Sequence, residues 1–153
     1  MAKAGDNSKK AVVEALNGAL ADHLALYLKT KNFHWHVAGP RFRDLHLLFD
    51  EQATQIIGVV DLIGERVRKN GAETLTSIGS VSRTSKINDQ DDTSLEADAM
   101  VKELRDDNAT LLTRLRAVKD AAEEAEDHAT SGVVDDWIDQ AEERVWFLSQ
   151  VLK

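Results

Sequence analysis

The scarcity of helix-breaking residues is the feature that most constrains the fold of this chain. Its 153 residues include one proline and only eight glycines. Proline and glycine interrupt helices and fill most tight turns, so long helices can form here while hairpin turns have few places to form. Apolar residues recur three or four positions apart, beginning with Val12, Leu16 and Ala19, which is the period of an amphipathic helix. The sequence therefore predicts an all-α fold.

Four long helices are predicted from the apolar pattern, over residues 8–37, 42–69, 94–126 and 133–152. Asn7 or Ser8 is expected to cap the first helix, and Thr93 or Ser94 to start the third. The breaks between helices are expected at Gly39-Pro40, Asn70-Gly71 and Thr130-Ser131-Gly132.

Residues 70–93 form the longest segment without helical periodicity. A connection of this length fits a crossover between parallel helices, with a short helix inside it. The whole pattern predicts a four-helix bundle with its long connection between the second and third helices. Its length suits a single domain, residues 9–153, preceded by a flexible tail, residues 1–8.

Charge and composition narrow the choice of function. Asp and Glu outnumber Lys and Arg by 27 to 19, a net charge of −8 that opposes binding of nucleic acid by the body of the protein. There is no cysteine, so any metal must be bound by histidine nitrogen and carboxylate oxygen. The apolar stretch 11–30 contains charged residues and is not a membrane span. With no targeting signal recognised, a cytoplasmic location is expected.

A narrow stripe of histidine and carboxylate side chains marks the second predicted helix. At about 100° per residue, four of them fall within an arc of about 100°: His46, Asp50, Asp61 and Glu65. Such groups are typical ligands of iron and other divalent metals. His46 and Asp61 are nevertheless about 22 Å apart along the helix, so one chain cannot bring both to one ion. Two copies packed antiparallel across a two-fold axis could, which predicts sites shared between chains.

The stripe belongs to a longer set of motifs, namely His34-Trp35, Gly39-Pro40-x-Phe42, His46-Leu47-Leu48-Phe49-Asp50, Asp61-x-x-x-Glu65-Arg66 and Val145-Trp146-Phe147-Leu148. Together they resemble the Dps family, the DNA-binding proteins from starved cells or mini-ferritins, over nearly the whole chain. The sequence contains no Glu-x-x-His, the motif with which other ferritin-like proteins bind iron inside one bundle. Any iron site must therefore lie elsewhere.

The resemblance implies a ferritin-like subunit with a short helix in the crossover, assembled into a hollow shell of twelve. It implies ferroxidase sites on the two-fold axes, with His34, His46 and Asp50 from one subunit and Asp61 and Glu65 from its neighbour. By the same resemblance, Fe(II) is oxidised preferably by hydrogen peroxide and stored as ferric mineral, which protects DNA. For Asp50 a salt bridge, or a role in orienting a metal-bound histidine, is the alternative.

The remaining three histidines have less specific interpretations. His36 is expected at the surface or an interface, because it points about 200° away from His34 on a helix. His23 is expected in the packed core or an interface. His128 follows an acidic run and is assigned no role.

Trp35, Arg66 and the acidic run each have two interpretations. Interface packing is favoured for Trp35 over interception of radicals, and Arg66 is expected either to pair across a subunit interface or to be solvated. The acidic run 123–127 either lines a pore through which cations enter or forms a solvated acidic face. Asp135 and Asp136 are expected to stabilise the start of the last helix through its dipole.

Two functions compete on these grounds: a ferroxidase and iron-storage cage, and a nucleoid protein that acts mainly by coating DNA. A plain helical interaction bundle is disfavoured by the spacing of histidine and carboxylate. DNA binding would depend on Lys3, Lys9 and Lys10, against Asp6 and the negative net charge. We expect weak DNA binding, no membrane association and iron chemistry as the main activity.

Overall fold

A computed structural model describes residues 4–153, with side chains from residue 7 onward, and contains no strand in that range. Its helices are α1 (Ala4–His36), α2 (Phe42–Lys69), α3 (Ile78–Thr84), α4 (Ala97–Glu124) and α5 (His128–Val151). The predicted all-α fold, with four long helices and a short one in the crossover, is confirmed. None of these described helices combines the length and the apolar character needed to cross a membrane.

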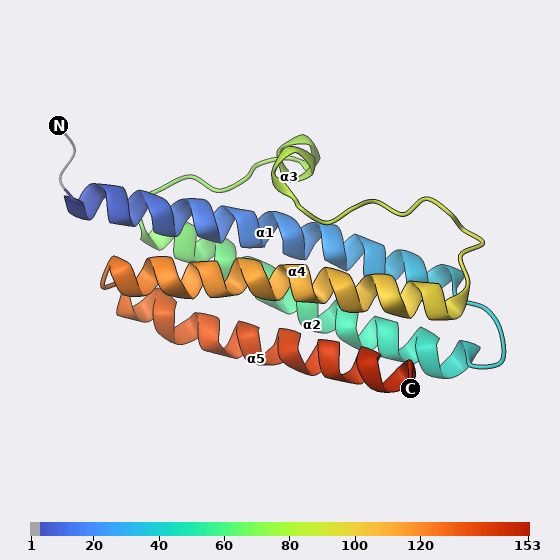
Figure 1. The fold of residues 1–153 in the computed structure, drawn as a ribbon. Coiled ribbons are helices and arrows are strands. Elements are labelled where there is room, and N and C mark those ends of the chain that lie inside the picture. Colours follow the sequence, from blue (N-terminus) through green and yellow to red (C-terminus); the bar gives the residue numbers. More distant parts are fainter. Residues whose placement is uncertain (1–3) are drawn as a thin grey trace.

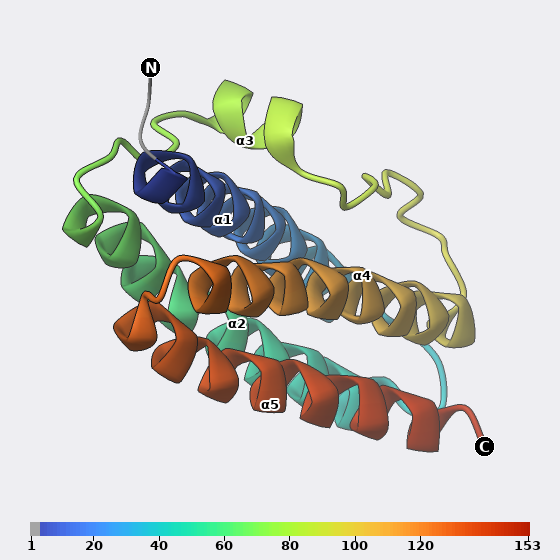
Figure 2. The same cartoon turned by 60° about the vertical axis from the view of Figure 1, so that its left-hand side comes forward.

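The four long helices form two antiparallel pairs, α1 with α2 and α4 with α5 (Figure 1). The pairs pack on each other through α1 with α4 and through α2 with α5. Figure 2 shows the connection between α2 and α4 running along the bundle, with α3 over α1. Because this connection returns to the end where α2 began, α4 runs in the same direction as α2. This is the topology expected of a bundle with one long crossover.

The start of α1 differs from the predicted one. The helix begins at Ala4, so Asn7 and Ser8 lie inside it and neither is its N-cap. A side-chain cap is only one way to begin a helix, and here the helical backbone continues a turn further. Residues 4–8 of the predicted tail are therefore helical, while residues 1–3 lie outside the described residues.

The start of α4 also differs. Glu96 occupies the N-cap position, and Thr93 and Ser94, predicted to begin this helix, lie in a turn before it. In that turn the Asp92 side chain accepts a hydrogen bond from the Ser94 backbone N–H at 2.9 Å. Short polar side chains that bond locally to the backbone compete with helix formation in this way.

The turn between α4 and α5 comes earlier than predicted. The segment 130–132, expected to break the chain, is part of the first turns of α5. Asp127 caps this helix, because its carboxylate accepts hydrogen bonds from the Thr130 backbone N–H at 3.1 Å and hydroxyl at 2.6 Å. Glu126 makes the reversal with a φ of 55°, a conformation more often adopted by glycine.

Charged residues attach the crossover to the bundle. The fully buried Asp22 carboxylate accepts hydrogen bonds from the Lys86 backbone N–H at 2.7 Å and from Arg114 Nε at 2.8 Å. The buried ammonium of Lys29 donates to the Asn88 carbonyl oxygen at 2.8 Å. Buried charges are costly unless they are paired in this way, so these contacts fix the path of residues 85–90.

Candidate metal centre

Two histidine side chains meet where α1 ends and α2 begins. His34 Nδ1 lies 2.6 Å from the backbone carbonyl oxygen of His46, and His46 Nδ1 lies 2.7 Å from that of His34. A carbonyl oxygen can only accept, so each Nδ1 carries a proton and donates it. Each Nε2 then keeps a free lone pair. Both rings are thus held in the tautomer that binds a metal through Nε2.

Ring stacking holds the same pair in place. The ring centroids of His34 and His46 are 3.9 Å apart and their planes differ by 13°. The Phe42 ring also stacks on His46, with 5.0 Å between centroids. The turn that joins the two helices depends on Gly39, whose φ of 111° is strained for any residue with a side chain. The motif around Gly39-Pro40 therefore places both imidazoles together.

Asp50 lies beside the histidine pair and forms a salt bridge with Lys31. Its Oδ1 is 2.7 Å from Lys31 Nζ and 3.7 Å from His34 Nε2. The hydrogen bond from Lys31 lowers the pKa of Asp50, which keeps the carboxylate ionised. The salt bridge predicted as one alternative is present, and metal binding by Asp50 stays a prediction. Lys31 was missed from the sequence, although it lies three residues before His34, on the same helical face.

Asp61 and Glu65 lie one turn apart on the exposed side of α2. Hydrogen bonding and charge repulsion from Asp61 raise the pKa of Glu65. Two carboxylates that repel each other form a favourable place for a cation. Leu62 and Leu47, on the same side of the helix, are 52% and 44% exposed. Each leucine follows a predicted ligand directly in the sequence, Leu47 after His46 and Leu62 after Asp61.

The two parts of the predicted site do not meet within one chain. The histidine pair lies at the start of α2, and Asp61 follows about 22 Å further along the helix. Among residues 7–153, no three histidine, aspartate or glutamate side chains are close enough together to hold a metal ion. One chain therefore presents two incomplete sets of ligands.

Comparison with known proteins places the chain in a family. A model of the ferritin-like domain matches residues 13–153. The DNA protection during starvation protein of Brevibacillus brevis is 32% identical over 142 residues, which are 93% of this chain and 95% of that protein. The chain belongs to the Dps group of the ferritin-like family. The resemblance drawn from the motifs is thus confirmed.

Solved Dps structures share the whole fold. Dps from Thermosynechococcus elongatus has a TM-score of 0.95 at 25% identity, over 99% of this chain and 96% of that one. A Dps protein from Bacillus brevis has a TM-score of 0.92 at 31% identity, over 100% of both chains. The crossover and its short helix are therefore part of a Dps fold.

Other predicted positions have mixed outcomes. His23 is buried in the core, as expected, and His36 is exposed at the surface. The Trp35 side chain is exposed, and its ring centroid lies 5.9 Å from Lys31 Nζ. This position tests neither interface packing nor the interception of radicals. Arg66 is half-buried and donates to Thr130 Oγ1 at 3.0 Å. The solvated alternative for Arg66 is therefore wrong, because the early start of α5 brings Thr130 to the end of α2.

The acidic run at the end of α4 is partly neutralised. Lys119 Nζ lies 3.6 Å from Glu123 Oε1 and 2.9 Å from Asp135 Oδ1, and Asp127 caps α5. Asp135 and Asp136 both lie beyond the first turn of α5, so the dipole explanation given for them is wrong. Asp135 instead forms an ion pair with Lys119. Glu124 and Glu126 are the exposed carboxylates that remain for an entry pore.

Proposed function

We propose that this Dps protein is a ferroxidase and iron-storage protein that oxidises Fe(II), preferably with hydrogen peroxide, and so protects DNA. The observation that carries the proposal is the His34–His46 pair, with both Nδ1 atoms bonded to backbone and both Nε2 atoms free. Membership of the ferritin-like family supports iron as the metal. The name of the Brevibacillus brevis relative, DNA protection during starvation protein, supports the protective role.

In this proposal a second copy completes each site. His34, His46 and Asp50 of one chain face Asp61 and Glu65 of the other across a two-fold axis, and vice versa. The incomplete ligand sets of the single chain and the exposed leucines on α2 support this arrangement. Six such pairs would build the closed shell of twelve chains expected from the resemblance, with ferric mineral inside.

The proposed reaction balances without a radical product. Two Fe(II) ions each give up one electron, and one hydrogen peroxide molecule takes both electrons and two protons. Its O–O bond breaks and two water molecules form. Because the two electrons reach the same peroxide molecule, hydroxyl radical is not released. The chain's own part is to bind both Fe(II) substrate ions through imidazole nitrogen and carboxylate oxygen.

The direct test adds Fe(II) to the iron-free protein without oxygen, then adds hydrogen peroxide and follows ferric absorbance. Replacing His46 by alanine should slow oxidation at least about tenfold, because even residues that only support metal ligands cost that much. His36→Ala is the matched control, since this histidine is exposed and two residues from His34. Wild-type oxidation by the His46→Ala protein would contradict the proposal.

DNA coating is the alternative function. Lys9 and Lys10 are exposed in the first turns of α1, whereas Lys3 lies outside the described residues. The net charge of −8 opposes contact with phosphate elsewhere on the surface. A double change of Lys9 and Lys10 to glutamate should abolish any DNA gel shift and leave iron oxidation unchanged. Loss of both activities together would contradict this separation.

A further inference from the structure

A positive charge is buried at the centre of the bundle. The Arg144 side chain, on α5, is 2% exposed. Its Nε donates to Asn108 Oδ1 at 2.7 Å and its Nη1 to Gln55 Oε1 at 2.8 Å, so both acceptors are neutral amides. Among the side chains described, no carboxylate lies within ion-pair distance of this guanidinium. Burial lowers the pKa of Arg144 to about 10, and the charge of Glu143 partly opposes this effect, so the guanidinium stays charged at neutral pH.

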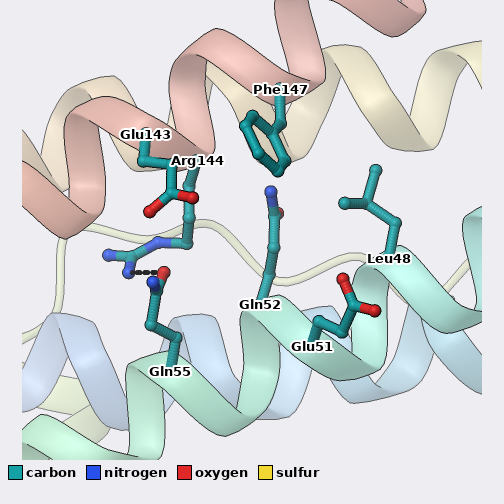
Figure 3. A pocket seen from close by; sticks show the side chains of 7 residues that line it. All are labelled: Leu48, Glu51, Gln52, Gln55, Glu143, Arg144 and Phe147. Atoms are coloured by element: carbon teal, nitrogen blue, oxygen red, sulfur yellow. Dashed lines mark hydrogen bonds between the residues drawn. The ribbon is translucent and has the colours of Figure 1, made fainter.

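A cavity of about 110 Å³ lies beside this arginine, between α2 and α5 (Figure 3). Gln52 projects from α2 into it and is only 5% exposed. Neither the amide oxygen nor the amide nitrogen of Gln52 has a hydrogen-bond partner. Buried amides are almost always bonded, because an unpaired one is costly. The rest of the wall consists of Leu48, Glu51, Gln55, Glu143 and Phe147.

We propose that this cavity binds a small oxoanion that keeps at least one O–H group, such as dihydrogen phosphate or bicarbonate. The guanidinium of Arg144 supplies the positive charge and planar donors suited to oxoanions. The Gln52 amide donates to one ligand oxygen and accepts from a ligand hydroxyl. The cavity is several times larger than the space that one water molecule needs, so a ligand of this size fits.

The two wall carboxylates decide which oxoanions are accepted. Glu51 and Glu143 are both exposed side chains at the cavity. Each can accept a hydrogen bond from a ligand hydroxyl and repels an anion that has no proton to donate. The site should therefore prefer dihydrogen phosphate or bicarbonate to sulfate, which resembles phosphate in shape but is fully deprotonated at neutral pH.

Calorimetric titration of the iron-free assembled protein with phosphate, bicarbonate and sulfate, each in turn, tests the proposal. Phosphate or bicarbonate should bind saturably and at least about tenfold more tightly than sulfate. Gln52→Leu keeps the volume and removes both amide partners, so it should weaken binding about tenfold, as expected for a lost hydrogen bond to a charged group. Glu143→Gln, at an exposed position, should reduce the preference over sulfate, because Glu51 remains. Glu142→Gln, its exposed neighbour outside the cavity, should behave like the wild type.

Three results would overturn the proposal. The first is no saturable binding of either phosphate or bicarbonate by the wild type, in which case the cavity holds water only. The second is equal affinity of the wild type for sulfate and phosphate. The third is unchanged affinity in the folded Gln52→Leu protein. The wild-type titrations decide the matter even if Gln52→Leu fails to fold.

Discussion

His34 and His46 each donate a hydrogen bond from Nδ1 to the backbone carbonyl oxygen of the other, at 2.6 and 2.7 Å. The backbone thus selects the imidazole tautomer without any bound metal. We expect ¹⁵N spectra of iron-free protein with labelled histidine, at about pH 8, to show both rings protonated at Nδ1 and unprotonated at Nε2. A ring without a proton on Nδ1 under these conditions would contradict the bonding described here.

The proposed shared site predicts rescue by mixing two inactive proteins. His46→Ala and Asp61→Ala each remove one ligand from every site, so each protein alone should oxidise Fe(II) slowly. After dissociation, mixing in equal amounts and reassembly, random pairing makes half of the two-fold pairs mixed. Each mixed pair contains one intact site and one that lacks both ligands. About a quarter of the wild-type activity should therefore return.

The control for this experiment is the mass of the reassembled protein, which must match that of the wild type. Two preparations of the same variant, mixed in the same way, should show no gain. If reassembly is complete and no activity returns, the ligands belong to a single chain and the shared site is wrong.

The salt bridge between Lys31 and Asp50 predicts competition with iron. If Asp50 binds Fe(II) as proposed, the metal must first displace the Lys31 ammonium from its carboxylate. Lys31→Met should therefore tighten anaerobic Fe(II) binding about two- to fivefold, because half-exposed ion pairs are worth up to about 1 kcal/mol. Calorimetry measures this, with Lys31→Arg as the variant that keeps the charge. Weaker binding in Lys31→Met would show that Lys31 assists the site.

Burial of His23 makes stability depend on pH. Loss of hydration lowers the pKa of His23 to about 4, and the charge of Arg144 adds to this effect, while the hydrogen bond to the Ala19 carbonyl opposes it. In the unfolded chain, His23 takes up a proton near pH 6.5. The stability gained by burying the neutral imidazole is therefore fully present above that pH. It should fall as the pH drops from 6.5 towards 4, by about 3 kcal/mol at most.

Denaturant unfolding between pH 7 and pH 4 measures this loss. His23→Asn keeps a donor for the Ala19 carbonyl and does not titrate, so its stability should change less over the same range. His128→Asn, at an exposed position, is the control and should follow the wild type. Parallel curves for wild type and His23→Asn would show that other groups cause the acid sensitivity.

The cap of α5 also bonds to the end of α2. Asp127 accepts hydrogen bonds from Thr130, from Asn70 Nδ2 at 3.3 Å and from Arg66 Nη2 at 3.5 Å. Asp127→Ala should destabilise the protein by about 2 kcal/mol, because the cap is lost and Arg66 loses its ion-pair partner. Thermal unfolding measures the loss, and Glu124→Ala, at an exposed carboxylate nearby, should change little. Equal effects of the two changes would contradict the role of Asp127.

Much of the fold followed from local and periodic features. The 3.6-residue apolar period located the four long helices, and Gly39-Pro40 located the first turn, because both depend only on neighbours in the sequence. The start of α5 was missed because the sequence offers two possible breaks between the last two helices, one at Asp127 and one at Thr130-Ser131-Gly132. The backbone conformation of Glu126 and the hydrogen bond to Asp127 show that the chain reverses at residues 126–127 and not at residues 130–132.

The sequence by itself determined that His46, Asp61 and Glu65 lie along one stripe of one helix, and that His46 and Asp61 cannot share an ion within one chain. Both conclusions depend only on the rise and twist of a helix. The tertiary structure alone decided that the Nδ1 atoms of His34 and His46 bond to backbone, that Lys31 pairs with Asp50, and that Arg144 is buried beside a cavity. These contacts join different helices, and their partners depend on the register in which packing sets one helix against the next.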